Sequence, residues 1–177
     1  IHDAAEAEIF AARVPDTFGV YFVPAFAGLG SPHQDPYSRG SFFGITQGTS
    51  KYHVARAALE AMAYQIKDAF DVMKFRSGMN IDHLRIGGGS AKNDFLMQFI
   101  ADMLGIVVER TLINESSVLG ASLFAGLATG YWESAEETQS LIRVDRRWAP
   151  NLPTESRDEL YRGWKKAVKR TSGWMKD

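Results

Sequence analysis

Apolar residues recur every three to four positions in several stretches of the chain, and this spacing predicts helices. The longest stretch covers residues 50–75. A second covers 93–104, where Gly105 stands in the position that commonly ends a helix. A third helix, predicted over 117–129, is rich in small residues that suit close packing against a sheet or another helix.

The two ends of the chain also have helical patterns. Residues 1–13 mix acidic and alanine residues in a way typical of the end of a helix. A terminal helix is predicted within 151–177, beginning at about Ser156. Three bulky residues of this helix share one face: Tyr161, Trp164 and Val168. Residues 134–150 are polar apart from a short apolar segment, and no regular element is assigned there.

Short runs of consecutive apolar residues predict strands at 19–26, 41–45, 83–86 and 106–110. Residues 27–40 contain too many glycine and proline residues for a regular element and are predicted to form a loop. Because strands alternate with helices along the chain, the predicted fold class is α/β, a sheet with helices on both sides.

Composition narrows the class of protein. A chain of 177 residues that is 45% hydrophobic is long enough to form one folded domain with a core. Its 20 Lys and Arg residues are balanced by 21 Asp and Glu residues, so no overall positive charge favours nucleic acid or an acidic membrane surface. We therefore expect neither nucleic acid nor membrane as a partner.

The chain has no cysteine, which excludes disulfide scaffolds, cysteine nucleophiles and thiolate metal sites. No apolar run approaches the roughly 18 residues needed to span a bilayer. The first ten residues are acidic where a signal peptide would be basic and then apolar. A cytoplasmic location is therefore expected. The chain opens at Ile1 within a helical pattern, which predicts that it is a piece of a longer protein.

The most informative local feature is the run of three glycines, residues 87–89, between a predicted strand and a predicted helix. Glycines let a phosphate approach the backbone closely, and a helix N-terminus directs N–H groups at it. The run matches neither the G-x-G-x-x-G nor the P-loop pattern. It predicts a phosphate site or, alternatively, a tight turn in which the glycines avoid side-chain clashes.

Asn93 stands at the predicted start of the helix that follows the glycines. Asparagine at this position commonly caps the helix by accepting a backbone hydrogen bond. The functional alternative is that its side-chain amide faces a ligand resting on the helix end.

The loop at 27–40 contains His33, Asp35 and Arg39, which together suggest a base, an acid and an anion clamp. However, Asp-Pro commonly opens a turn, and the turn interpretation is favoured. The four histidines have no metal-ligand spacing, and no serine lies in a G-x-S-x-G context. Basic residues at 165–170 fit an ordinary charged end of a helix better than a nucleic-acid patch.

Residues 40–45, GSFFGI, are followed after seven residues by His53-Val54 and then by AALE at 57–60. This spacing resembles the second signature of the FGGY carbohydrate kinases. Other stretches are similar to the members of that family that phosphorylate glycerol: 20–30, 35–40, 93–98, 108–110 and 163–170. The resemblance extends over nearly the whole chain and is weakest between 133 and 155.

The resemblance implies an actin-like, ribonuclease H-like fold in which ATP lies on the second of two domains. Residues 1–177 would form most of that C-terminal nucleotide-binding domain, without its first strands. In the family, the glycine turn lies against the ATP phosphates and the Asn four residues later borders the adenine. Carried over, these cofactor-binding residues are Gly88, Gly89 and Asn93.

The resemblance further implies the cofactors ATP and Mg²⁺, glycerol or a related polyol as acceptor, glycerol 3-phosphate as product, and a homo-oligomer. The family's catalytic Asp and polyol-binding residues belong upstream of Ile1. No catalytic residue is therefore assigned here, and the isolated chain is expected to be catalytically silent because it lacks a base and an acceptor site.

Two departures from the family pattern leave the acceptor open. Gly87 stands where an Asp is usual, and His33-Gln34 replaces an aromatic pair. A kinase for another polyol or sugar is one alternative. A non-catalytic nucleotide-binding or assembly module is another, although a sheet without its edge strands would expose unpaired backbone.

Overall fold

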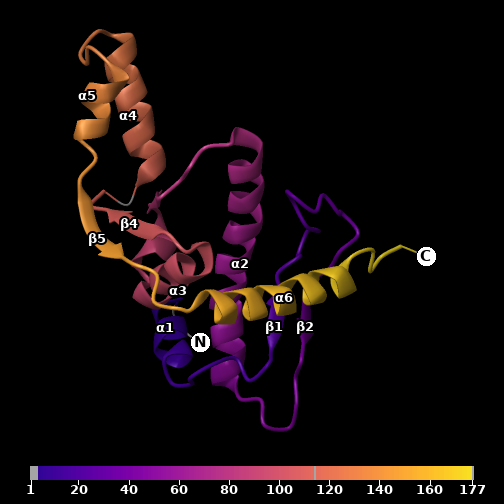
Figure 1. Ribbon diagram of the computed structural model, residues 1–177. Helices are drawn as coiled ribbons and strands as arrows, with labels where there is room; N and C mark the ends of the chain where they lie inside the picture. The colour runs from indigo at the N-terminus through magenta and orange to yellow at the C-terminus, as the bar shows by residue number, and fades with distance from the viewer. Residues whose placement is uncertain (1–3, 114, 177) are drawn as a thin grey trace.

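The computed structural model describes residues 4–113 and 115–176 (Figure 1). Its helices are α1 (Ala4–Ala11), α2 (Lys51–Ser77), the 3₁₀ turn η1 (Gly89–Lys92), α3 (Asp94–Leu104), α4 (Ser116–Ala128), α5 (Ala135–Ser140) and α6 (Thr154–Thr171). Its strands are β1 (Tyr21–Val23), β2 (Ser41–Phe43), β3 (His83–Ile86), β4 (Val107–Thr111) and β5 (Val144–Trp148).

The strands form two small sheets. β1 pairs with β2 in antiparallel orientation. β4 is the central strand of the other sheet, parallel to β3 and antiparallel to β5. The parallel pair is connected through η1 and α3, which is the strand, helix, strand arrangement typical of an α/β fold.

The core lies where α2, α3 and α6 meet β1, and Figure 1 shows α6 crossing α2 on one side. Tyr64 of α2 is at its centre, stacked on Trp164 with ring centroids 5.4 Å apart and edge-on to Phe99 at 5.6 Å. The apolar face predicted for the terminal helix is confirmed, because Trp164 and Val168 are buried and Tyr161 packs against them.

The first two predicted strands are shorter than the apolar runs suggested. The run at 19–26 yields only Tyr21–Val23, because Pro24 has no N–H to donate and Ala25 N turns back to Val23 O at 2.9 Å. The run at 41–45 yields Ser41–Phe43, which ends at Gly44 with a φ of +82°. Of the helix predicted over 1–13, Ala4–Ala11 is helical, and residues 1–3 lie outside the described residues.

Two elements lie in the segment to which no structure was assigned, α5 and β5. β5 is an edge strand with exposed charged residues at Asp145, Arg146 and Arg147. The sequence of β5 contains no apolar run that would predict a strand. Backbone hydrogen bonds to β4 and ion pairs with residues of that strand stabilise β5 instead.

The close packing predicted for the helix at 117–129 is not observed. α4 has no buried residue, and Figure 1 shows α4 and α5 extending away from the core. Gly126 lies against the ring of Trp132, whereas a Cβ at Gly120 would meet no atom within 4 Å. In the described part of the chain, no helix is long and apolar enough to cross a membrane.

Candidate functional site

The glycine turn, residues 87–89, follows the end of β3. Gly88 has a φ of +96°, in the left-handed region that favours glycine. A Cβ at Gly88 or Gly89 would meet no atom within 4 Å, so crowding within the described chain does not explain glycine at position 89. The turn is open to an approaching ligand.

The turn also presents backbone donors. Within residues 4–113 and 115–176, the N–H groups of Gly88, Gly89 and Ser90 have no hydrogen-bond acceptor. Successive free N–H groups around a glycine form a concavity that suits an anion such as a phosphate. The geometry is therefore compatible with the predicted phosphate site.

α3 begins at Asp94, which confirms the helix predicted over 93–104, and a 3₁₀ turn lies between the glycines and this helix. In this turn, η1, Ala91 N donates to Gly88 O and Asn93 N to Ser90 O, both at 3.1 Å. Ala91 is fully buried, so this turn is anchored in the core.

Asn93 is the N-cap of α3. Its Oδ1 accepts a hydrogen bond from Leu96 N at 2.8 Å, which confirms the capping interpretation. Its Nδ2 group has no acceptor among the residues that the structure describes, so the amide donor remains free to face a ligand. The two interpretations of Asn93 are thus compatible, because they use different atoms of one side chain.

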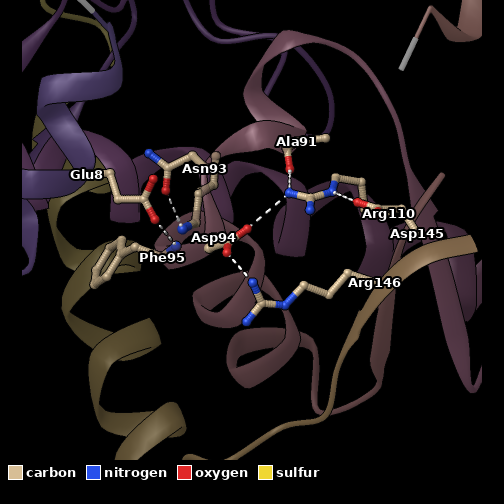
Figure 2. A network of polar contacts seen from close by, with 9 residues as sticks. Glu8, Ala91, Asn93, Asp94, Phe95, Arg110, Asp145 and Arg146 are labelled. Carbon is tan, nitrogen blue, oxygen red and sulfur yellow. Dashed lines mark hydrogen bonds and ion pairs between the residues drawn. The ribbon is translucent and has the colours of Figure 1, made fainter. Parts of the chain in front are cut away.

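A second side chain occupies the start of α3 from far away in the sequence. Glu8 of α1 accepts a hydrogen bond from Phe95 N at 3.1 Å (Figure 2). Two first-turn N–H groups of α3 are therefore already bonded to side chains. Among the described residues, the backbone donors left for a phosphate are those of the glycine turn and the N–H of Asp94, so the turn supplies most of the predicted site.

Asp94 connects α3 to the neighbouring sheet. Its carboxylate accepts from Arg110 Nη1 at 3.0 Å and from Arg146 Nη1, as Figure 2 shows. Arg110 also donates to Asp145 Oδ2 at 2.6 Å and to the carbonyl of Ala91 at 3.2 Å. The hydrogen bond to Asp145 raises the pKa of Arg110 above its usual value. Residues 94 and 110 fell inside the family resemblance, but no sequence signal indicated that they meet.

The three loop residues considered as a catalytic set each have partners of their own. Arg39 Nη1 donates to the carbonyls of Pro36 and Ser38. Asp35 accepts from Ser38 Oγ at 2.8 Å, a hydrogen bond that lowers the pKa of Asp35, and from Tyr37 N and Gly173 N. Asp35 therefore organises a turn, as the favoured interpretation predicted.

His33 has a structural partner as well. Its Nε2 lies 2.9 Å from Oδ2 of the buried Asp68 of α2. Asp68 also accepts from Tyr161 Oη at 2.5 Å and Trp164 Nε1 at 2.9 Å, both of α6. The four side chains join the loop to two core helices, and this role accounts for His33 without a ligand.

Residues of the signature at 40–60 make contacts that stabilise the fold. A Cβ at Gly44 would lie 2.1 Å from Gly19 O, so only glycine fits there. His53 Nδ1 accepts from Ser50 N at 3.0 Å at the start of α2. Glu60 is buried and bonded to Arg56 and Tyr64, and its burial raises its pKa. These residues hold β2 and α2 in place rather than forming a reaction centre.

A pocket of about 250 Å³ lies apart from the glycine turn, between the end of β4 and the α4–α5 hairpin. Its lining is mainly apolar: Thr111, Leu112, Ile113, Leu119, Leu141, Ile142 and Arg143. Within the described residues, no group of three or more His, Cys, Asp or Glu side chains is placed to hold a metal ion.

Comparison with known proteins gives concordant results. Residues 2–129 match the FGGY family of carbohydrate kinases, C-terminal domain. The chain is 51% identical over 176 residues to glycerol kinase 2 of Thermotoga maritima, covering 99% of this chain and 36% of that protein. It is 47% identical over 177 residues to the glycerol kinase of Haemophilus influenzae, covering 100% of this chain and 35% of the relative.

Among solved structures, the glycerol kinase of Plasmodium falciparum with ADP superposes with a TM-score of 0.85 at 35% identity. The match covers 97% of this chain and 34% of that one. The chain thus spans about a third of the length of the relatives it matches, and its fold is that of their actin-like C-terminal domain.

Proposed function

The chain belongs to the FGGY family of carbohydrate kinases, and from this membership we propose that it is the nucleotide-binding C-terminal part of a glycerol kinase. The whole enzyme would transfer the γ-phosphoryl group of ATP to glycerol and release glycerol 3-phosphate. The observation that supports this most directly is the identity of about half of all residues to glycerol kinases over 99% of the chain.

The proposed role of this chain is to bind the nucleotide. The free N–H groups of the glycine turn would donate to phosphate oxygens, since Gly88 and Gly89 leave the approach open. The free Nδ2 group of Asn93 would face the adenine end. The solved glycerol kinase with ADP supports nucleotide use in this family.

Among the described residues, no group of three or more His, Cys, Asp or Glu side chains is placed to hold a metal ion without the nucleotide. We therefore propose no Mg²⁺ ligand in this chain and assign Mg²⁺ to the nucleotide as its counter-ion. The base that accepts the proton of the acceptor hydroxyl would lie in the rest of a longer protein.

The surface of the chain supports its being one part of a larger domain. β3 is an edge strand of its sheet, and large apolar side chains are exposed on other elements of the chain. Phe75 of α2 and Phe124 of α4 are 89% and 74% exposed. Exposed apolar side chains and an unpaired strand edge are typical of surfaces that another segment covers, and we propose that upstream strands of the same protein cover β3 and α4.

One of the two departures from the family pattern no longer bears on which polyol or sugar accepts the phosphoryl group. His33 departs from the usual pattern, but its contact with Asp68 gives it a structural role, so it does not bear on the acceptor. Gly87, which stands where an Asp is usual, still leaves the acceptor open. Measured in the full-length protein, ATP consumption with glycerol and with a panel of polyols and sugars would separate these acceptors. No turnover together with ADP binding would favour a non-catalytic module.

The nucleotide role of Asn93 is best tested with Asn93→Asp in the full-length protein. An Asp keeps the oxygen that caps α3 but removes the amide donor. We expect an unchanged thermal midpoint, a higher KM for ATP and a nearly unchanged KM for glycerol. Asn80→Ala, in an exposed loop, is the control. A raised KM for glycerol with an unchanged KM for ATP would refute the site assignment.

A further inference from the structure

The sheet β3-β4-β5 has one charge cluster on each face. Glu109 of β4 accepts from Arg85 of β3 at 3.0 Å and from Arg147 of β5 at 2.7 Å. Arg110, the next residue of β4, points to the opposite face because side chains alternate along a strand. Only the Arg110 cluster, with Asp94, Asp145 and Arg146, contacts the segment that follows the glycine turn.

Arg110 is connected to Gly88 by two successive hydrogen bonds. Its Nη1 donates to Ala91 O at 3.2 Å, and Ala91 N donates to Gly88 O at 3.1 Å. The same Nη1 holds Asp94 at the start of α3. Arg110 therefore fixes η1 at its middle and the first residue of α3.

Two nitrogens of Arg110, Nε and Nη1, donate to groups within the protein rather than to solvent. Nε donates to Asp145, Nη1 to Ala91 and Asp94, and the guanidinium lies 5.3 Å from the ring centroid of the buried Trp148. Only 16% of the side chain is exposed. A guanidinium in this setting holds other groups in position, since a planar fork with fixed partners is already organised.

We propose that Arg110 is a positioning residue for nucleotide binding, which holds the glycine turn and Asn93 in their binding geometry through Ala91 and Asp94. The inference rests on the proposed function, because it assigns the ligand of that turn. A binding group displaced by as little as 1 Å can lose much of its effect, so loss of Arg110 weakens nucleotide binding without removing any ligand contact.

The test is the affinity of the full-length protein for ADP, measured by calorimetry, together with the KM for ATP. For Arg110→Ala we expect the Kd for ADP to rise about tenfold or more, while the KM for glycerol stays near that of the unaltered protein. Arg110→Lys is expected to restore part of the affinity, since one ammonium can hold one carboxylate but not three partners at once.

Two controls separate positioning from general damage. Arg147→Ala removes an arginine of the same sheet whose partner, Glu109, lies on the other face, and it should leave the Kd for ADP unchanged. Val108→Ala removes part of a fully buried side chain of β4 and lowers the thermal midpoint, while every hydrogen-bonding side chain of the cluster is kept. It should also leave the Kd unchanged well below that midpoint.

The outcomes separate this inference from the proposed function. If the unaltered protein fails to bind ADP, the proposed function fails and the inference with it. If it binds ADP but folded Arg110→Ala binds equally well, or Val108→Ala weakens binding as much, the positioning role is refuted and the proposed function stands. If Arg110→Ala does not fold, the Kd for ADP is measured instead for Arg110→Lys and for Asp94→Asn. The second variant removes the negative charge that pairs with Arg110.

Discussion

Helices α3 and α4 follow neighbouring strands of one sheet and are both rich in apolar residues, yet their surroundings differ completely. Seven of the eleven residues of α3 are buried, whereas none of the thirteen residues of α4 is. α3 lies between α2, α6 and the sheet, while α4 and α5 extend away from the molecule in Figure 1. Apolar content predicted both helices, but burial depends on whether another element covers them.

The ends of the two helices differ in the same way. At the start of α3, Asn93 accepts from Leu96 N and Glu8 accepts from Phe95 N, and the helix ends at Gly105 with a φ of +67°. The N-cap residue of α4 is Glu115, and its side chain makes no capping hydrogen bond. A helix with no side-chain cap at its N-terminus and no covering neighbour depends on a partner for its stability, which fits the proposal that upstream strands cover α4.

The largest expected difference concerns side-chain truncation. Ile100→Ala in α3 should lower the free energy of unfolding by about 2–5 kcal/mol, since it leaves a cavity in the core. Phe124→Ala in α4 should change it by no more than about 0.5 kcal/mol in the 177-residue chain. Urea denaturation followed by circular dichroism measures both.

The full-length protein extends this test. If upstream strands cover α4, Phe124→Ala should there cost about 3–5 kcal/mol. Glu133→Ala, at an exposed position beyond α4, is a control expected to have little effect in either protein. An equally small effect of Phe124→Ala in both proteins would mean that α4 stays uncovered.

A smaller difference is expected at the caps. Asn93→Ala removes the acceptor of Leu96 N and should lower stability by about 1 kcal/mol. Glu115→Ala removes no cap bond and should lower it by less than about 0.5 kcal/mol. Thermal unfolding of the two variants side by side makes the comparison, and equal losses would contradict the assignment of Asn93 as the stronger cap.

The smallest expected effect is a pH dependence in β4, the strand that leads into α4. Burial acts to raise the pKa of Glu109, but the hydrogen bonds from Arg85 and Arg147 outweigh it and hold that pKa below its ordinary value. A carboxyl group with a lowered pKa stabilises the fold above its unfolded pKa of about 4.3, and this contribution is lost as the pH falls through the folded value. Stability should therefore fall below about pH 4.3.

Glu109→Gln tests that contribution, since the amide has no charge to lose. Its free energy of unfolding should fall less steeply between about pH 4.3 and lower pH than that of the unaltered chain. Glu133→Gln, at an exposed position between α4 and α5, is the control and should leave the slope near its original value. Identical slopes for Glu109→Gln and the unaltered chain would show that the two arginines do not stabilise the charged form.

Much of the fold follows from local patterns in the sequence. The spacing of apolar residues located α2, α3, α4 and α6 to within a few residues, because a helix repeats its face every three to four positions whatever surrounds it. Strand β3, the cap at Asn93 and the C-terminal glycine of α3 were likewise predictable, since each depends on neighbours within four residues.

The candidate site was predictable only in part. Gly88, Gly89 and Asn93 were identified by their spacing and by the family resemblance, and their nucleotide role remains a prediction. Glu8, Asp94 and Arg110, which surround the turn, escaped notice because the partners that meet there are 16 to 87 positions apart. Nothing in the local spacing of polar residues specifies which of them a fold will bring together.

The amino-acid sequence alone determines local structure, because side chains return to the same face every 3.6 residues in a helix and every 2 residues in a strand. Local patterns are sufficient to place the longer helices, the glycine turn and the α/β class, but not α5. Burial and long-range charge pairing are properties of the packed molecule, since they arise when distant segments exclude water from between them. For that reason α3 and α4 look alike in sequence, while one forms the core and the other remains open.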